Sequence, residues 1–546
     1  MVLYITLITV TVGITVLCSA VKSTTQSKEI IDLSGDYTRF YSCCGCGFQT
    51  GPADRIPSKI TLLKLSDNEL LTFSSESVPS VEHLIWLYLN GNKLKSITLK
   101  NSNVLVVFLE RNDISNISNS FKNLTNMQAL ALQENKITEI PKDLLNEMPV
   151  LELLNMSSNK IKQIPQQSCF TPAFRKHQLA SLSHLFLDHN DISEILHNTF
   201  DFRGLRGLYL QRNKIESVSD DAMKLPSLGM LNLSGNMIES LDLASFPFVS
   251  EGISLTVDLS DNKIINLTNK RNYNAIRVHT LDLSNNSVAP NSTVLFFDGL
   301  ASLKVLILSN NKMIDVPRDV FKKQVGLFSL DLSLNLFTNI PLLNISSLRN
   351  LRSLNLSGSQ IQVIDNDSLA SLKGLKILLL TNNNISHINA NGFNDLVNLE
   401  YLDLRGNCFV CNCDMYGFSK WLSQHGEIEV KGALCKYPEK LRGIDISRLN
   451  RTHFCFREDI FTFGVAVAVA LILGTPVYWN SERYVITKVQ CCFGSVLQCI
   501  ELNLKGGELP RFFIKKYTVY TDVLRPKAFT ISLMKGFGSR RQYFVI

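Results

Sequence analysis

The sequence predicts an α/β solenoid, in which short parallel strands form one curved sheet and the connecting segments pack on its outer side. Three observations predict this fold. A leucine-rich unit recurs about every 24 residues between residues 60 and 409. Cysteines gather in short segments on either side of the repeated region. The chain of 546 residues is 45% hydrophobic and 19% charged, which excludes a disordered or collagen-like protein.

Residues 1–20 predict a secretory signal peptide. The segment from Val2 to Leu17 is uncharged and mostly apolar, and Cys18 and Ala20 place small residues before a cleavage point. Because the segment contains no Lys or Arg, the alternative that it stays in the membrane as an anchor remains open.

The pattern L-x-x-L-x-L-x-x-N-x-L fills residues 58–409 with about fifteen units. The central x-L-x predicts a short strand whose alternate side chains point inward, and stacked units share one leucine core. The amide of the Asn can satisfy backbone groups where the chain leaves the strand, so we expect a structural ladder. Its positions are Asn68, Asn92, Asn112, Asn135, Asn159, Asn190, Asn213, Asn236, Asn262, Asn286, Asn311, Asn335, Asn383 and Asn407, with Ser359 in the thirteenth unit.

Cysteines predict caps at both ends of the solenoid, which would otherwise expose its core. Residues 21–57 predict a degenerate N-terminal cap that contains Cys43, Cys44 and Cys46. Residues 410–456 predict a C-terminal cap with four cysteines, which allow three pairings, and a zinc site is the alternative reading of its C-x-C motif. The exported body has nine cysteines, an odd number, so we expect one that is free or bonded to another chain, with Cys169 and Cys408 as the candidates.

A second apolar segment predicts a transmembrane helix over residues 460–480. The segment Ile460–Ser481 contains no charged residue and is long enough to span a bilayer. From Asn480 onward the chain has 11 Lys and Arg against 4 Asp and Glu, so residues 481–546 predict a short basic cytoplasmic tail. A buried core helix is the alternative for the apolar segment.

The repeated unit resembles the leucine-rich repeat, and the resemblance implies a horseshoe with its parallel sheet on the concave side. The segment that begins Cys408-Phe409-Val410-Cys411-Asn412-Cys413 resembles the C-terminal flanking cap of extracellular leucine-rich repeat proteins. That resemblance implies the disulfides Cys411–Cys435 and Cys413–Cys455. The whole arrangement is similar to the ectodomain and membrane anchor of Toll-like receptors, although the tail has no recognisable TIR domain.

The solvent-facing positions of the strands provide the candidate ligand contacts. Large aromatic side chains gather in the N-terminal half of this strip, and acidic side chains gather in the C-terminal half. Exposed aromatic side chains on neighbouring strands are typical of a contact surface. The alternative is that they shield the sheet beneath a glycan or a neighbouring copy. The candidates are Trp86, Tyr88, Phe108, Phe186 and Tyr209.

Twelve Asn-x-Ser/Thr sequons predict N-glycosylation. Three of them lie on the same strip of the concave face, where glycans would obstruct a ligand. The twelve are Asn116, Asn123, Asn155, Asn232, Asn266, Asn285, Asn291, Asn344, Asn355, Asn366, Asn384 and Asn450, of which Asn155, Asn232 and Asn355 are on the strip.

The sequence contains no motif of an enzyme, a phosphate-binding loop or a metalloprotease, so we expect no catalysis, cofactor, metal or nucleic-acid binding. The resemblance implies a single-pass type I receptor of the plasma membrane, or of the endosomal membrane, that recognises microbial patterns in innate immunity. Its partners would be an extracellular macromolecule, microbial or protein, and further receptor copies in a homo- or heterodimer. Signalling would need a partner or a missing TIR domain. The alternatives are an adhesion or matrix-interaction protein and a decoy co-receptor.

Overall fold

The computed structural model describes residues 40–49, 56, 60–79, 81–100, 102–165, 181–273, 276–343, 345–365 and 369–455. Of the remainder it describes the backbone of six short strands between residues 477 and 545. The chain divides into two units, Met1–Leu449 and Asn450–Ile546. The predicted signal peptide lies outside the described residues.

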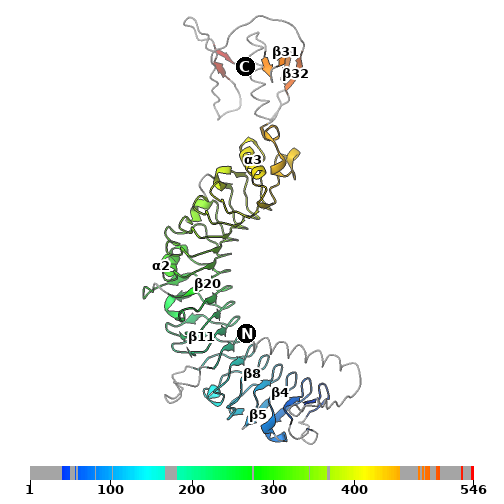
Figure 1. Ribbon diagram of the computed structural model, residues 1–546, viewed down its shortest axis with the longest axis vertical. Helices are drawn as coiled ribbons and strands as arrows, with labels where there is room; N and C mark the ends of the chain where they lie inside the picture. The colour runs from blue at the N-terminus through cyan, green and yellow to red at the C-terminus, as the bar shows by residue number, and fades with distance from the viewer. Residues whose placement is uncertain are drawn as a thin grey trace. The chain divides into compact units, whose positions relative to one another are not determined.

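One parallel sheet runs along the first unit, with one strand from each predicted repeat (Figure 1). Each strand pairs with the next one in chain order, so the predicted solenoid with a parallel sheet is confirmed. Figure 1 shows these units stacked in an arc with the sheet on its inner side and α2 on its outer side. The strands are β2 Leu62–Lys64, β4 Trp86–Tyr88, β6 Val106–Phe108, β8 Ala129–Ala131, β9 Leu153–Asn155, β10 His184–Phe186, β13 Gly207–Tyr209, β16 Met230–Asn232, β18 Leu255–Asp258, β20 Val278–Asp282, β21 Val305–Ile307, β22 Ser329–Asp331, β23 Ser353–Asn355, β25 Ile377–Leu379 and β27 Tyr401–Asp403.

The core is a column of aliphatic side chains on the face of this sheet that points away from the concave surface, into the solenoid. The central residue of each strand pairs in register with that of the next, as Leu63 does with Leu87 and Leu87 with Val107. These side chains are fully buried. Because no single unit could bury its leucines alone, the stacking of units stabilises each of them.

The Asn ladder joins each unit to its neighbours through backbone groups. Nδ2 of Asn92 donates to the carbonyl oxygens of Leu65 and Leu89, at 2.9 Å each. Its Oδ1 accepts the N–H of Leu70 at 3.1 Å. The same arrangement recurs along the solenoid, so the structural role predicted for this Asn is confirmed.

The residue before each ladder position has a positive φ in all fifteen units. The sequence pattern did not predict this turn, because the position accepts many residue types. The set comprises Asp67, Gly91, Arg111, Glu134, Ser158, His189, Arg212, Gly235, Asp261, Asn285, Asn310, Leu334, Gly358, Asn382 and Gly406.

The outer side of the solenoid consists of short strands, 3-10 turns and one helix, α2 Thr293–Asp298. The short strands are β3 Thr72–Ser74, β5 Ser96–Lys100, β7 Phe121–Lys122, β11 Glu194–Ile195, β12 Phe200–Asp201, β14 Ser217–Val218, β15 Met223–Lys224, β17 Ser240–Asp242, β19 Asn266–Thr268, β24 Val363–Ile364 and β26 His387–Ile388. The 3-10 turns are η2 Ser75–Ser77, η3 Val81–His83, η4 Leu144–Glu147, η7 Leu243–Ser245, η8 Pro290–Ser292, η9 Ile340–Leu343, η10 Ala390–Phe393, η11 Cys413–Met415, η12 Glu439–Leu441 and η13 Ile446–Arg448.

A cap covers each end of the sheet and adds one strand to it. At the start, β1 Phe40–Ser42 pairs with β2, and a disulfide joins Cys43 to Cys46. At the end, α3 Tyr416–Gln424 packs its Phe418 and Trp421 against Phe393 of the last repeats. The cap then contributes β28 Glu429–Lys431, which pairs with β27.

The predicted transmembrane helix over residues 460–480 lies mostly outside the described residues, and no helix among those described is long and apolar enough to cross a membrane. At the end of the predicted span, β29 Val477–Trp479 pairs antiparallel with β30 Glu482–Tyr484. Aromatic and β-branched residues after Pro476 favour a strand over a helix. The second unit also contains β31 Ile486–Cys491, β32 Ile500–Leu504, β33 Thr530–Ser532 and β34 Tyr543–Val545.

Candidate functional site on the concave face

The structure brings the five candidate contact residues together in two groups. The first cluster consists of Trp86, Tyr88 and Phe108 on strands β4 and β6. Its rings stack, with centroids 6.5 Å apart for Trp86 and Tyr88 and 4.6 Å apart for Tyr88 and Phe108. The second pair consists of Phe186 and Tyr209 on strands β10 and β13, with centroids 4.5 Å apart and an angle of 2° between the ring planes.

The prediction that the first cluster is exposed is wrong for two of its three residues. Tyr88 is 3% exposed and Phe108 is 5% exposed, and Trp86 is half-buried against them. Neighbouring strands lie only about 4.8 Å apart, so large rings at the same register cover one another. Burial also raises the pKa of Glu110, two residues after Phe108, to about 7. Little of this cluster is left for a partner to contact.

The second pair is half-buried and therefore offers ring surface on the concave face. Gly207, two residues before Tyr209, gives the pair its space. A Cβ at Gly207 would lie 2.8 Å from Tyr209 Cε2 and 2.8 Å from His184 Cδ2, closer than real Cβ contacts allow. The strand pattern alone could not identify this glycine as part of the site, because its position tolerates many residues.

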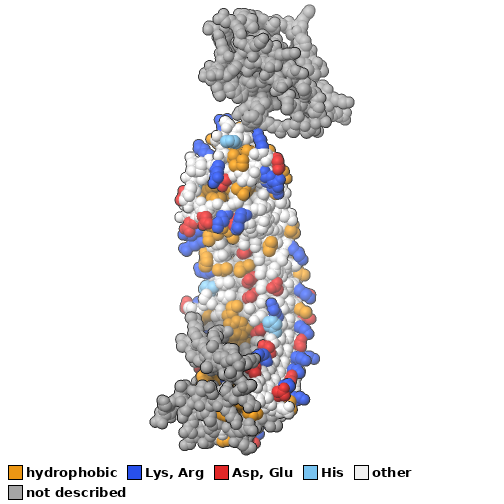
Figure 2. All heavy atoms as spheres, turned by 90° about the vertical axis from the view of Figure 1, so that its right-hand side faces the viewer, with side chains coloured by type: hydrophobic (Ala, Val, Ile, Leu, Met, Phe, Trp, Pro, Cys, Tyr) orange, Lys and Arg blue, Asp and Glu red, His pale blue; other side chains and the backbone are white. Residues whose placement is uncertain are grey.

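Acidic side chains follow the second pair along the sheet, as the sequence predicted. Asp258 and Asp282 lie at paired positions of β18 and β20, and Asp331 lies on β22. Burial raises the pKa of Asp282, and the carboxylates of Asp258 and Asp331 raise it further, although hydrogen bonds from Ser284 oppose them. Figure 2 faces the concave side and shows acidic side chains among apolar ones in its middle part. The face is therefore polar and partly anionic beyond Tyr209.

Seven of the twelve sequon asparagines are exposed in the structure, namely Asn116, Asn123, Asn266, Asn285, Asn291, Asn384 and Asn450. The three on the concave strip, Asn155, Asn232 and Asn355, are half-buried. Asn344 and Asn366 lie outside the described residues.

The cysteines of the C-terminal cap form disulfides. Cys411 is joined to Cys435, the pairing that the resemblance implied, and Cys413 and Cys455 are each disulfide-bonded. The alternative of a zinc site at C-x-C is therefore wrong for this structure. Cys408 has a free thiol that accepts a hydrogen bond from Lys436 Nζ at 3.3 Å, whereas Cys169 lies outside the described residues.

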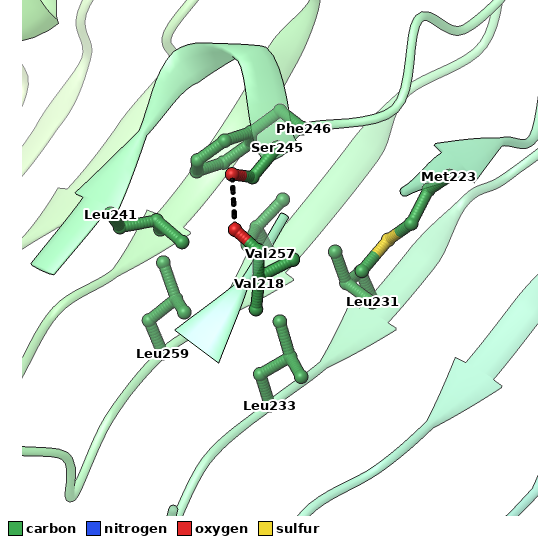
Figure 3. A pocket seen from close by; sticks show the side chains of 9 residues that line it. All are labelled: Val218, Met223, Leu231, Leu233, Leu241, Ser245, Phe246, Val257 and Leu259. Atoms are coloured by element: carbon green, nitrogen blue, oxygen red, sulfur yellow. Dashed lines mark hydrogen bonds between the residues drawn. The ribbon is translucent and has the colours of Figure 1, made fainter. Parts of the chain in front are cut away.

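Figure 3 shows a cavity in the interior of the solenoid. It is a packing gap that is too small for a ligand. Its volume is about 10 Å³, and its lining is apolar apart from Ser245, whose hydroxyl donates to Val218 O at 2.9 Å. A water molecule needs at least about 10–15 Å³ and several polar partners. Among the described residues, no group of His, Cys, Asp and Glu side chains could hold a metal ion. The half-buried Phe186–Tyr209 pair on the concave face is therefore kept as the candidate site.

Comparisons with known proteins agree with the repeat architecture. A family model described as "Leucine rich repeat" matches residues 125–192, 203–247, 301–360 and 349–409, so the chain contains leucine-rich repeats. Keratocan of Gallus gallus is 27% identical over 180 residues, which cover 29% of this chain and 50% of keratocan. Osteomodulin of Bos taurus is 30% identical over 140 residues, which cover 25% of this chain and 30% of osteomodulin. The chain spans about half the length of the keratocans that it matches.

Solved structures show a similar fold. The structure of a TLR13–ssRNA13 complex has a TM-score of 0.53 and 24% identity, and the match covers 69% of this chain and 52% of that one. A leucine-rich repeat protein of Leptospira interrogans has a TM-score of 0.51 and 24% identity, and the match covers 74% of this chain and all of that one. These likenesses show the solenoid fold and nothing more specific.

Proposed function

We propose that this protein is an extracellular leucine-rich repeat protein that binds a macromolecular partner of the extracellular matrix or of another cell surface through its concave face. The half-buried Phe186–Tyr209 pair carries this proposal, because aromatic rings on a rigid sheet are typical anchors of protein interfaces. Disulfides in both caps support an extracellular location, since such bonds persist in oxidising compartments. The likeness to keratocan and osteomodulin favours a matrix partner over a microbial one.

The test is binding of the secreted protein to matrix deposited by cultured fibroblasts. Phe186→Ala and Tyr209→Ala should each weaken binding about tenfold or more, which is the usual effect at an interface anchor. Phe248→Ala is the matched control, because Phe248 is 52% exposed and lies outside the concave strands. Equal binding by all three variants would contradict the proposed site, and no binding by the unaltered protein would contradict a matrix partner.

The second candidate function is a Toll-like pattern-recognition receptor that crosses the plasma membrane or the endosomal membrane once. The uncharged segment Ile460–Ser481 and the basic tail after it favour this candidate. Such a receptor would act as a homo- or heterodimer and signal through a partner, or would serve as a decoy co-receptor. A response to microbial products in reporter cells, with no binding to the deposited matrix, would support this candidate over the first.

A further inference from the structure

Two sequon asparagines flank the Phe186–Tyr209 pair at the same register. Asn155 pairs with Phe186 across β9 and β10, Phe186 pairs with Tyr209, and Tyr209 pairs with Asn232 across β13 and β16. Each asparagine therefore lies one strand away from a ring, about 4.8 Å along the solenoid.

The rings turn their outer faces toward these asparagines. Their centroids are 4.5 Å apart and their planes are parallel within 2°, so the stacking direction follows the direction from strand to strand. The face of Phe186 opposite Tyr209 consequently looks toward Asn155, and the face of Tyr209 opposite Phe186 looks toward Asn232. A flat group attached to either asparagine would continue the stack.

Hydrogen bonds orient the two asparagine side chains for such an attachment. Oδ1 of Asn155 accepts from Ser157 N at 3.0 Å and lies 2.8 Å from Ser157 Oγ, whose single proton it shares with Asp188 Oδ1 at 2.6 Å. Oδ1 of Asn232 accepts from the backbone and hydroxyl of Ser234 at 2.9 and 2.7 Å. These bonds hold each amide oxygen toward the serine of its own sequon, so the nitrogen that would carry a glycan points away from that serine.

Asn355, the third sequon of the strip, also accepts from the N–H of its sequon serine, Ser357, at 3.1 Å, but it has no aromatic ring at its register. Its Nδ2 donates to Asp331 Oδ2 at 2.9 Å, and its register partners are Asp331 and Leu379. An aromatic platform therefore exists at two of the three concave sequons.

We propose that N-glycans on Asn155 and Asn232 stack their first sugars on the outer faces of the Phe186–Tyr209 pair and thereby limit the access of a partner to it. The apolar C–H face of a sugar ring gains from contact with the face of an aromatic ring, whose π-electrons are negative. The part of this inference that concerns access rests on the proposed function, whereas the stacking of sugars on rings does not.

The experiment uses the full chain secreted by mammalian cells, with glycopeptide mass spectrometry to establish occupancy of Asn155. Thermal unfolding is then compared before and after enzymatic removal of the glycans, in the unaltered protein and in Phe186→Leu. Removal should lower the Tm of the unaltered protein by about 2 °C more than that of Phe186→Leu, because the leucine variant has lost the ring. Phe186→Tyr, which keeps a ring, should behave as the unaltered protein does.

Ser118→Ala is the control, since it eliminates the exposed sequon at Asn116, which lies outside the concave strands. The change in Tm caused by Ser118→Ala should be the same in the unaltered protein and in Phe186→Leu. An unoccupied Asn155, or equal losses of Tm in the unaltered protein and Phe186→Leu, would overturn the proposal.

Binding to fibroblast matrix tests the access part. Removal of glycans should strengthen binding severalfold, and Phe186→Leu should abolish that gain. If glycan removal lowers Tm more in the unaltered protein than in Phe186→Leu but does not strengthen binding, the stacking stands and only the limit on partner access is overturned. Coupling in Tm with no matrix binding by any form would overturn the proposed function and leave the stacking established.

Discussion

Leu334 lies across Gly358, the residue at the equivalent position of the next repeat. Leu334 has a φ of 56°, Gly358 has a φ of 66°, and a Cβ on Gly358 would lie 2.5 Å from Leu334 Cδ2. A leucine in this left-handed conformation is strained, whereas glycine and asparagine adopt it readily. The side chain of Leu334 is also 57% exposed, so it gains little from burial in return.

Leu334→Asn should therefore increase the free energy of unfolding by about 1 kcal/mol, the strain that the leucine backbone carries. Thermal unfolding of the secreted protein measures the change as a higher Tm. Ile314→Asn is the matched control, because Ile314 is 61% exposed and has no positive φ. If Tm rises by a similar amount in both variants, the cause is the more polar surface and the predicted strain at Leu334 is contradicted.

Ser359 interrupts the Asn ladder, and we expect Ser359→Asn to repair it. The buried hydroxyl of Ser359 has no hydrogen-bond partner among the described residues. An asparagine there could donate to the carbonyls of Leu332 and Leu356, as Asn335 does to Leu308 and Leu332 one unit earlier. The substitution should raise the free energy of unfolding by about 1–2 kcal/mol.

The reverse substitution, Asn335→Ser, should lower the free energy of unfolding by about 2 kcal/mol, because it leaves backbone groups unpaired. Both variants can be compared by chemical unfolding of the secreted chain. A Ser359→Asn variant less stable than the unaltered protein would mean that this unit has no room for the larger amide.

Asp242 should make the stability of the solenoid depend on acidic pH. Burial raises its pKa, but hydrogen bonds from Thr268 Oγ1 at 2.5 Å and from the N–H groups of Ala244 and Lys270 outweigh burial, so its pKa lies below the usual value. A lowered pKa contributes stability above the unfolded pKa of about 3.9, and that stability is lost as the pH falls through the folded pKa.

Asp242→Asn should lower Tm at pH 7 by the equivalent of about 1 kcal/mol, because one carboxylate oxygen becomes an NH2 group that cannot accept from both Thr268 and Lys270. It should also flatten the fall of Tm below about pH 4. Asp143→Asn serves as the control, since Asp143 is exposed and its side chain makes no capping bond. Parallel Tm curves for Asp242→Asn and the unaltered protein between pH 2 and pH 7 would rule out this role for Asp242.

The disulfide Cys411–Cys435 should stabilise the C-terminal cap covalently. It closes a loop with a sequence separation of 24, which corresponds to about 3 kcal/mol of lost entropy in the unfolded chain. The double variant Cys411→Ser with Cys435→Ser should lose that stability in thermal unfolding. Cys408→Ser should keep the original Tm while the number of titratable thiols falls by one, because Cys408 is free.

The sequence predicted the fifteen repeat strands because the buried positions of this fold recur about every 24 residues along the chain. A leucine or valine at the centre of each strand, with an asparagine five residues later in all units but the one with Ser359, sufficed to locate strands as distant as β2 and β27. It did not predict β28, because Glu429-Val430-Lys431 has neither the leucine pattern nor a buried centre.

The candidate site was less predictable than the fold. Alternation along a strand correctly assigned Tyr88 and Phe186 to the concave side. Whether a ring there is buried depends on the side chains of neighbouring units, which are twenty or more residues away in the chain. For that reason the sequence could not separate the closed first cluster from the half-buried second pair, nor identify Gly207 as the residue that gives Tyr209 its space.

Strand β28 has a consequence for how copies of this protein behave in concentrated solution. The edge strand of a sheet normally attracts another edge, and a solenoid with two such edges could polymerise into a filament. Beyond β28, the carbonyl of Ala433 accepts from Ile446 N, and the N–H of Cys435 donates to Ile444 O. These bonds pair the backbone directly after β28 within the cap, so that stretch has fewer free groups with which the edge of a second molecule could pair.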